Sequence, residues 1–336
     1  MVKYNDDAGN RTQMVKNSVT TSYTYNNNNQ LLTEKSPDVN ITYAYDGSGN
    51  MVSKTDANNA NNNASYAWNW RNHLLSVSQP DGNTAYAYDG DGTRISKTQG
   101  GVKTKYINDV ALGLVQVLME TTDANIVQAV YTYGNNLISM KRADVNSYYH
   151  YDGLGSTRQL TNSAGAVTVS YMYDSFGNKI AGTGTSDNAY GFTGQQQFGE
   201  ADSLMFLRAR YYKPSIGRFL QMDPLGMMPN GRKWNPFNPL MRYKEGINLY
   251  AYVKNNSVNF TDPSGNICCD AAGLAFCFLQ LYQDILDNLG TVSLCTIGCR
   301  VCIATHDPVT CGVCAGCALW VLIRVADCFG ENCSLD

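Results

Sequence analysis

The sequence predicts a mainly β fold built from antiparallel hairpins, followed by a small all-α, cysteine-rich C-terminal domain. Three features of the 336 residues support this prediction. A tyrosine-centred phrase recurs along the first half of the chain. Of the 23 tyrosines, only Tyr282 lies beyond residue 266. All 11 cysteines lie between Cys268 and Cys333, so the preceding part of the chain contains none.

The recurring phrase is Tyr-x-Tyr followed by Asp or Asn, with some drift. Its copies end at Tyr25, Tyr45, Trp68, Tyr88, Tyr133 and Tyr173. The first four are separated by 20, 23 and 20 residues, and Gly-Asn or Gly-Thr follows several of them. Such a regular period is typical of a repeat architecture.

Each copy reads as a hairpin. Two aromatic residues spaced by two lie on one face of a strand. Asp-x-x-Gly then turns the chain, because Asp bonds the local backbone and Gly accepts a positive φ. One hairpin cannot bury its face alone, so neighbours must stack or wind into one continuous sheet. A β-sandwich of unrelated hairpins is the alternative, and the regular spacing favours the repeat.

Charge divides the chain where the cysteines begin. Residues 1–266 carry 23 basic and 21 acidic groups, against 2 and 7 for residues 267–336. The net charge of −3 gives no basis for phosphate contacts, so we expect no nucleic-acid partner. The start, MVKYNDDAGN, has no apolar signal core and already contains a repeat turn. We therefore expect the chain to be a fragment of a longer protein.

Residues 150–226 close the repeated region with a distinct set of phrases. They hold turns at Tyr151-Asp152 and Tyr173-Asp174, a Gly-Phe-Thr-Gly-Gln loop, an Arg-Tyr-Tyr strand and a Gly-Arg-Phe…Asp-Pro exit. Over most of residues 4–265 the chain resembles the Rhs/YD-repeat family, and residues 150–226 resemble its Rhs-associated core.

This resemblance implies a fold and a domain order. It implies a YD-repeat spiral or shell fragment that encloses a C-terminal payload. YD repeats would occupy residues 1–149, the Rhs-associated core residues 150–266 and the payload residues 267–336. About six units are too few for a full shell, so the resemblance implies an upstream Rhs shell as a partner.

Two Asp-Pro-x-Gly phrases frame the exit from the core, at Asp223 and Asp262. In the resembled family such a pair marks self-cleavage after the second phrase, here near Asn266-Ile267. Two close carboxylates cannot both ionise, so one can act as an acid while the other activates water. Arg210 or Arg218 could orient a carboxylate or polarise the scissile carbonyl. These four residues are the predicted catalytic group.

The alternative interpretation is that each aspartate is only a structural turn residue, since Asp-Pro commonly opens a turn. The sequence also departs from the family pattern. Met227 and Asn266 stand where the family prefers leucine, and the insertion-like stretch 228–246 lengthens the spacer. Self-cleavage is therefore an expectation separate from the shell fold.

The cysteine-rich end switches to a helical pattern. Apolar residues at three- and four-residue steps predict a first helix over about residues 271–289. Three interpretations compete for the cysteines. A disulfide framework suits so short a segment. Alternatively, Cys311-x-x-Cys314-x-x-Cys317 could hold zinc or an iron–sulfur cluster. The third interpretation is that the cysteines are reduced and buried in the core.

We favour the disulfide framework and assign no metal and no cofactor. The predicted disulfide residues are Cys268, Cys269, Cys277, Cys295, Cys299, Cys302, Cys311, Cys314, Cys317, Cys328 and Cys333. The odd count leaves at least one thiol unpaired within the chain.

The tail resembles the halocin-C8-like bacteriocin domains, which are small, helical and disulfide-rich. The likeness rests on Cys295-Thr296-Ile297-Gly298-Cys299, the adjacent cysteines near the start and the closing Cys-Phe-Gly-Glu-Asn-Cys. An apolar run follows Val313, but Arg324 interrupts it below the roughly 20 residues needed to span a bilayer. We expect a buried core helix at rest and membrane insertion after release.

The leading functional prediction is the end of an Rhs-type polymorphic toxin that releases a membrane-active antimicrobial payload in microbial competition. Its partners would be an immunity protein and a target-cell membrane, and its location secreted or on the cell surface. The alternative is a cell-surface YD-repeat protein that binds glycans or wall, with a disulfide-knot tail. An enzymatic payload is least favoured, because the tail lacks His-x-Glu with Pro-Cys-x-x-Cys and holds one histidine, His306.

Overall fold

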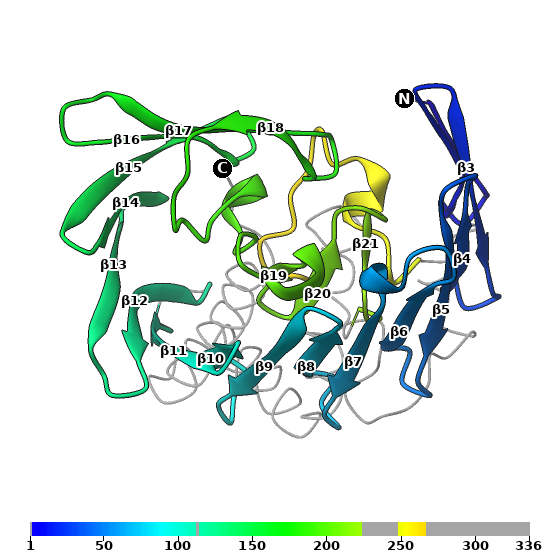
Figure 1. Ribbon diagram of the computed structural model, residues 1–336, viewed down its shortest axis with the longest axis horizontal. Coiled ribbons are helices and arrows are strands. Elements are labelled where there is room, and N and C mark those ends of the chain that lie inside the picture. The colour runs from blue at the N-terminus through cyan, green and yellow to red at the C-terminus, as the bar shows by residue number, and fades with distance from the viewer. Residues whose placement is uncertain (1, 112–113, 224–247, 267–336) are drawn as a thin grey trace, which may run out of the picture. The chain divides into compact units, whose positions relative to one another are not determined.

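The computed structural model describes residues 2–111, 114–223 and 248–266 (Figure 1). They lie in the first of the two units into which the chain divides, Met1–Asn266, and the second unit is Ile267–Asp336. The all-α domain and the cysteines predicted for residues 267–336 lie outside the described residues. Within the described ranges, no helix is long and apolar enough to cross a bilayer.

The described residues form a large antiparallel sheet and a small one, so the mainly β prediction is confirmed. The large sheet has 18 strands, and each strand pairs with the next in the chain. Its strands are β1 (Val2–Asn5), β2 (Arg11–Lys16), β3 (Val19–Tyr25), β4 (Leu31–Lys35), β5 (Asn40–Tyr45), β6 (Met51–Asp56), β7 (Ala64–Trp68), β8 (Leu74–Gln79), β9 (Gly82–Tyr88), β10 (Arg94–Gln99), β11 (Val102–Asp109), β12 (Gln116–Thr122), β13 (Val127–Tyr133), β14 (Leu137–Arg142), β15 (Val145–Tyr151), β16 (Thr157–Thr161), β17 (Val167–Tyr173) and β18 (Lys179–Thr183). A single 3-10 turn, η1 (Ala60–Asn62), lies between β6 and β7.

The sheet curves around the segment that follows it (Figure 1). We call residues 184–223 and 248–266 the core segment. It carries the three-stranded sheet of β19 (Met205–Leu207), β20 (Arg210–Lys213) and β21 (Arg218–Phe219), with 3-10 turns η2 (Phe192–Gly194), η3 (Ala201–Ser203) and η6 (Val253–Asn255). The repeating hairpins continue to Thr183 at the end of β18. Strand β15 includes residues on both sides of position 149/150, where the sequence predicted a domain boundary.

The two aromatic residues of each Tyr-x-Tyr phrase have different contacts. The first points inward and is at most 6 % exposed, as in Tyr23, Tyr43, Tyr66, Tyr86, Tyr131 and Tyr171. The second sits at an irregularity in the strand pairing, and in several phrases it donates a hydrogen bond back to an earlier strand. Tyr25 and Tyr88 hydroxyls donate to the carbonyls of Arg11 and Leu74 at 2.9 Å, and the Trp68 indole donates to Met51 at 2.7 Å. These bonds tie successive hairpins together.

The turn after most of these phrases follows one pattern, and the phrase that ends at Tyr133 is the exception, since Gly134 follows it. Asp46 Oδ1 accepts the backbone N–H groups of Ser48 and Asn50 at 2.9 and 2.8 Å. Asp174 does the same for Phe176 and Asn178 at 2.9 and 3.0 Å. Because the carboxylate accepts hydrogen bonds from two backbone N–H groups of the turn, these groups need no acceptor on a neighbouring strand. The aspartate of the Tyr-Asp unit is therefore a turn residue.

The interior is shared between the sheet and the core segment. In one apolar cluster, Leu204, Tyr211, Ile216 and Leu220 pack with the inward tyrosines of β3 to β9. In a second, Tyr190 packs with Tyr131, Tyr149 and Tyr171 and with aliphatic residues of β13 to β17. Because the hairpins in these two clusters bury their aromatic faces on this segment, the sheet and the core segment stabilise each other.

Candidate active site

Two buried aspartates and one arginine meet at the end of the core segment. Arg210 begins β20, Asp223 follows β21, and Asp262 lies in the last described stretch. Arg210 Nη2 lies 2.7 Å from Asp223 Oδ2 and 3.3 Å from Asp262 Oδ2. The three side chains are 2 %, 0 % and 3 % exposed. Arg210 Nη2 thus joins two carboxylates that lie 39 positions apart in the sequence, and the second of them, Asp262, is 52 positions from Arg210 itself.

The same guanidinium binds the chain near the predicted cleavage position. Arg210 Nε donates to the Gly265 carbonyl, and Nη1 donates to the Leu249 carbonyl at 3.1 Å. The guanidinium carbon of Arg210 lies 3.5 Å from the centre of the Phe219 ring, which packs against the face of the guanidinium group. Three kinds of contact therefore fix the plane of this arginine.

Asp262 has the environment of a carboxyl group that holds its proton. Burial, opposed by Arg210 and reinforced by the Asp223 carboxylate, raises the pKa of Asp262 to about 7. Its Oδ1 accepts the Gly265 N–H at 2.9 Å and the Ser264 hydroxyl at 3.3 Å. Near neutral pH such a carboxyl group can donate a proton as readily as accept one.

Gly265 is held against β19 and β20. Its φ of +74° lies in the left-handed region, and a Cβ built there would lie 1.9 Å from the Leu207 carbonyl oxygen and 3.0 Å from the Arg210 nitrogen. No side chain fits in that space. The glycine of the second Asp-Pro phrase therefore allows the chain to lie directly on the strand that carries Arg210.

Arg218 does not join this group. Its Nη1 donates to Asn10 Oδ1 at 2.9 Å, and its Nη2 donates to the Asn29 carbonyl and to Asn248 Oδ1. No ion pair links it to either aspartate in the described part of the chain. Of the two predicted arginines, Arg210 is therefore the one that contacts the carboxylates.

The predicted cleavage position is partly described. The Asn266 N–H donates to Ser264 Oγ at 3.2 Å, which continues the turn that Asp262 opens. Ile267 and Met227 lie outside the described residues, as does most of the spacer. In the described ranges, no group of three His, Cys, Asp or Glu side chains is arranged to hold a metal ion.

The arrangement can support acid–base hydrolysis of an amide. It provides two carboxyl groups next to each other, one of which is poised to carry a proton near pH 7. A fixed guanidinium lies between them and holds the backbone three residues after Asp262. These are the groups needed to activate water, orient a peptide carbonyl and protonate a leaving nitrogen.

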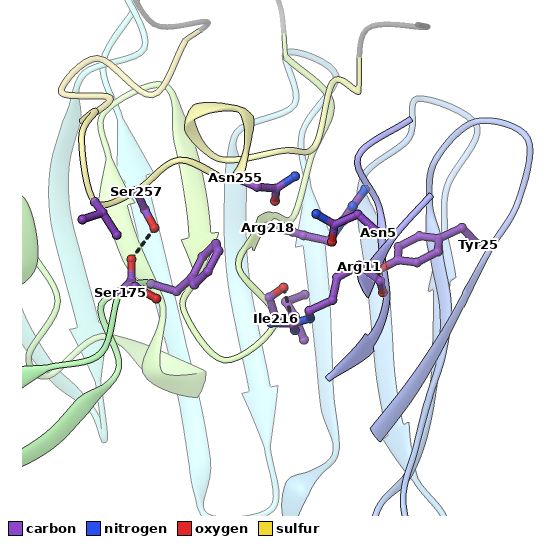
Figure 2. Close-up of a pocket in the computed structure, with 10 residues that line it drawn as sticks. Asn5, Arg11, Tyr25, Ser175, Ile216, Arg218, Asn255 and Ser257 are labelled. Carbon is purple, nitrogen blue, oxygen red and sulfur yellow. Dashed lines mark hydrogen bonds between the residues drawn. The ribbon is translucent and has the colours of Figure 1, made fainter. Parts of the chain in front are cut away.

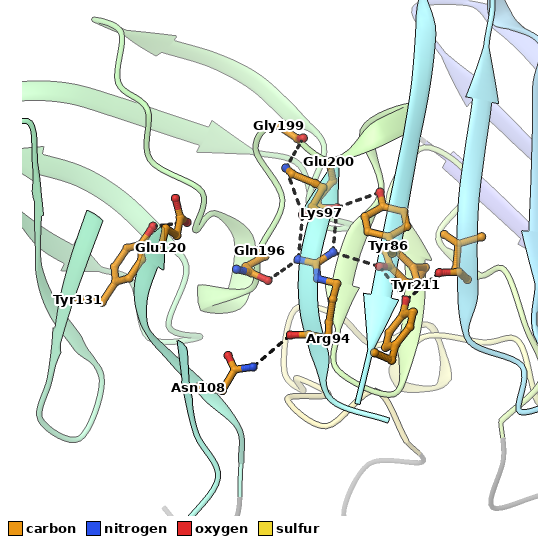
Figure 3. A network of polar contacts seen from close by, with 12 residues as sticks. Tyr86, Arg94, Lys97, Asn108, Glu120, Tyr131, Gln196, Gly199, Glu200 and Tyr211 are labelled. Carbon is orange, nitrogen blue, oxygen red and sulfur yellow. Dashed lines mark hydrogen bonds and ion pairs between the residues drawn. The ribbon is translucent and has the colours of Figure 1, made fainter. Parts of the chain in front are cut away.

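A second buried charge network joins the core segment to the sheet (Figure 3). Arg94, at the start of β10, forms an ion pair with Glu200 at 2.9 Å and donates to Gln196 at 2.5 Å and to the Tyr211 hydroxyl at 3.0 Å. Burial raises the pKa of Glu200, but Arg94 and Lys97 outweigh it and hold that pKa below its usual value. This network locks the core segment in place.

Sequence reasoning missed Arg94 and Glu200, although the repeat carried a signal for one of them. Arg94 pairs with Tyr88 at the position where Leu31, Met51 and Leu74 pair with Tyr25, Tyr45 and Trp68. An arginine in an inward, aliphatic position of a repeat indicates a buried anionic partner. No feature of Glu200 itself marked it as that partner.

A comparison with protein-family models identifies the fold. Residues 2–258 match the Teneurin YD-shell family. The chain belongs to this family. The curved meander with its tyrosine-lined interior is the corresponding part of a YD shell.

Relatives of this YD-shell chain include larger proteins named as toxins or nucleases. It is 34 % identical over 157 residues to the tRNA3(Ser)-specific nuclease WapA of Bacillus spizizenii, a match that covers 45 % of the chain and 6 % of the relative. It is 29 % identical over 147 residues to double-stranded DNA deaminase toxin A of Burkholderia cenocepacia, covering 42 % and 9 %. The chain thus spans a small fraction of the length of these relatives.

A solved structure of TcdB2-TccC3-Cdc42 is also similar to the YD-shell chain. The TM-score is 0.44 at 17 % sequence identity, and the match covers 79 % of this chain and 17 % of the solved one.

Proposed function

We propose that this YD-shell chain belongs to a toxin and hydrolyses its own backbone after the second Asp-Pro phrase, which releases the cysteine-rich tail. One observation carries the proposal: a single Arg210 nitrogen contacts both buried carboxylates while the same side chain binds the Gly265 carbonyl. The names of the WapA and deaminase relatives support a toxin shell as the setting.

The proposed reaction divides the roles between the two carboxyl groups. Asp223, as the carboxylate, takes a proton from water, and the resulting hydroxide attacks the scissile carbonyl carbon. Asp262, with its raised pKa, gives its proton to the leaving nitrogen as the carbon–nitrogen bond breaks. The products are a new carboxyl terminus and a new amino terminus, and the two aspartates end with one proton between them.

The scissile bond is proposed to be Asn266–Ile267, which follows the phrase directly. Arg210 anchors the preceding Gly265 carbonyl, and this contact fixes the chain one residue before the bond. Cleavage at Gly265–Asn266 is the neighbouring alternative, because the anchored carbonyl belongs to that bond. The two cases differ by one asparagine in the mass of each product.

We propose the released tail as the active agent. Its disulfide-rich, membrane-active character, an immunity protein and an upstream shell remain the predictions made from sequence. The relatives named as nuclease and deaminase make a nucleic-acid target the competing proposal. The tail's 2 basic and 7 acidic residues favour the membrane-active one, since nucleic-acid binding depends on basic side chains. Secretion or surface location is proposed to accompany a toxin role.

Mass spectrometry of the purified full chain tests the cleavage. The wild type is expected to give a cysteine-free fragment ending at Asn266 and a fragment beginning at Ile267. Asp223→Asn and Asp262→Asn should each leave the chain intact, because an amide cannot take a proton from water or donate one as an acid does. The exposed Asp187→Asn is the matched control and should cleave normally.

Two outcomes would reject the proposal. Cleavage at the wild-type rate in both active-site variants would remove the aspartates from the mechanism. An intact wild type, folded by circular dichroism and supplied with an upstream shell, would show that this chain does not cleave itself.

A further inference from the structure

A cavity of about 150 Å³ lies where the first hairpin, the turn after β17 and the core segment meet (Figure 2). It is lined by Asn5, Arg11 and Tyr25 from the first strands, by Ser175 and Phe176 from the turn, and by Ile216, Arg218, Asn255, Ser257 and Val258 from the core segment. The lining residues are mostly polar, and two are arginines. Such a cavity is large enough for a small polyatomic ion.

Both arginines are buried and bind neutral groups. Arg11 is 9 % exposed and its Nη2 donates to the carbonyls of Ile216 and Ser215 at 3.0 and 3.5 Å. Its Nε is buried without a hydrogen-bond partner. Arg218 is 5 % exposed and donates to two asparagine side chains and one backbone carbonyl. Carbonyl and amide oxygens solvate a cation but do not neutralise it.

The repeat itself supplies a comparison. Arg11 pairs with Asn5 at the position where Arg94 pairs with Tyr88 in a later unit. Arg94 has a buried carboxylate partner, Glu200, at 2.9 Å. Arg11 has the same place in its unit, yet forms no ion pair with any described residue. The same buried charge is therefore neutralised in one unit and left without a counter-ion in the other.

The acids that adjoin the lining residues Asn5 and Ser175 are engaged in their own turns. Asp6 accepts the N–H groups of Ala8 and Asn10 at 3.0 and 2.8 Å. Asp174 accepts those of Phe176 and Asn178. Among the described lining residues there is no carboxylate. Two positive charges thus line one partly open cavity, and their mutual repulsion favours an anion between them.

We propose that this cavity binds a small oxyanion, a phosphate or a carboxylate, between Arg11 and Arg218. Planar guanidinium groups bind such oxygens through charge-assisted hydrogen bonds. The ion would join the first hairpin to the core segment. Binding should therefore stabilise the folded protein against the unfolded chain.

Thermal unfolding of the full chain tests this site, with inorganic phosphate and acetate as probes at constant ionic strength set by chloride. We expect one of them to raise the Tm in a saturable manner, by about 3 °C or more at ten times its Kd. A response to phosphate identifies the tetrahedral oxyanion, and a response to acetate identifies the carboxylate.

Variants locate the effect. Arg11→Gln should weaken binding at least about tenfold, as should Arg218→Gln, because each removes one of the two charges. Arg11→Lys keeps the positive charge but loses the planar guanidinium group, so its affinity for the anion should lie between those of the glutamine variants and the wild type. Arg71→Gln removes an exposed arginine and should leave the response unchanged. Titration calorimetry on each variant that keeps its β-type circular dichroism gives the affinities.

The proposal fails if neither anion stabilises the wild type beyond the effect of chloride. It fails equally if Arg11→Lys and folded Arg11→Gln both bind with wild-type affinity. This test does not depend on self-cleavage, so it can be made on the Asp262→Asn chain.

Discussion

At the scale of single residues, Asp262 links the chemistry of the site to pH. Its pKa of about 7 lies above the ordinary value of 3.8, so the folded protein binds this proton more tightly than the unfolded chain. The free energy of unfolding should therefore fall as the pH rises from about 4 to about 7, and the contribution should be constant above that. Replacement by asparagine removes this dependence.

The first prediction concerns the pH profile of cleavage. If Asp262 supplies the proton, the rate should decrease about tenfold per unit above pH 7, because the acid form is then lost. Freshly translated chain sampled over time between pH 6 and 9 gives the rate by gel densitometry. A rate that keeps rising through pH 9 would contradict the acid role of Asp262.

The second prediction concerns Gly265. An alanine there would require a left-handed backbone and would place its Cβ against the Leu207 carbonyl. Gly265→Ala should therefore release the turn from Arg210 and slow cleavage more than about tenfold, since small displacements of reacting groups have effects of that size. Gly165→Ala is the matched control, because Gly165 has a φ of +79° with nothing within 4 Å. Equal rates in both variants and the wild type would show that this contact does not matter.

At the scale of elements, the repeat explains the sheet but not its attachment to the core segment. The Tyr-x-Tyr phrase and its Asp turn predicted the hairpins because both act within about 20 residues of sequence. The contacts of Arg94 with Glu200 and of Arg11 with the Ile216 carbonyl join residues 106 and 205 positions apart. Such contacts depend on how the sheet curves, which local patterns do not encode.

The third prediction tests the attachment. Glu200→Gln should lower the free energy of unfolding by about 3 to 5 kcal/mol, because it leaves the Arg94 charge buried without a counter-ion. Adding Arg94→Met, the residue type found at Met51, should recover part of that loss, since it removes the buried charge that Glu200→Gln leaves without a counter-ion. Urea unfolding measures all three chains.

An exposed ion pair provides the control for that experiment. Lys103 and Asp123 lie 3.0 Å apart with side chains 42 % and 68 % exposed. Asp123→Asn should leave the urea midpoint unchanged, because water screens such a pair. A midpoint for Glu200→Gln that matches this control would show that the buried pair does not hold the core segment.

At the scale of the whole molecule, the core segment bridges parts of the sheet that are far apart in sequence. Asn255 donates to the Gly9 carbonyl at 2.7 Å, and Ser257 donates to the Ser175 carbonyl. The first and last Tyr-Asp turns are thus linked through two residues of one short stretch. The predicted core, residues 150–266, included residues 248–257, but the sequence did not show that they make these links, because asparagine and serine in loops are common and bond to many partners.

The same long-range folding brings the predicted aspartates together. Asp223 and Asp262 were chosen by their Asp-Pro context, and Arg210 by its position in the Arg-Tyr-Tyr strand. The shared nitrogen contact could not be derived from those motifs, because the spacer between the two aspartates carries no periodic pattern that fixes their distance. Arg218 had an equal claim from sequence and serves instead to bind Asn10, Asn29 and Asn248.

The last prediction uses the separation of cysteines between the two units. Because all 11 lie beyond residue 266, a reductant can act on disulfides only in Ile267–Asp336. Mass measurement with and without reductant should show about five bridges, the most that 11 thiols allow. Reduction should abolish any toxicity of the tail, since a small core depends on such crosslinks. The rate of self-cleavage and the unfolding temperature of residues 1–266 should not change. Complete alkylation of all 11 thiols in protein purified under oxidising conditions would reject the framework, and stoichiometric zinc or iron would replace it with a metal site.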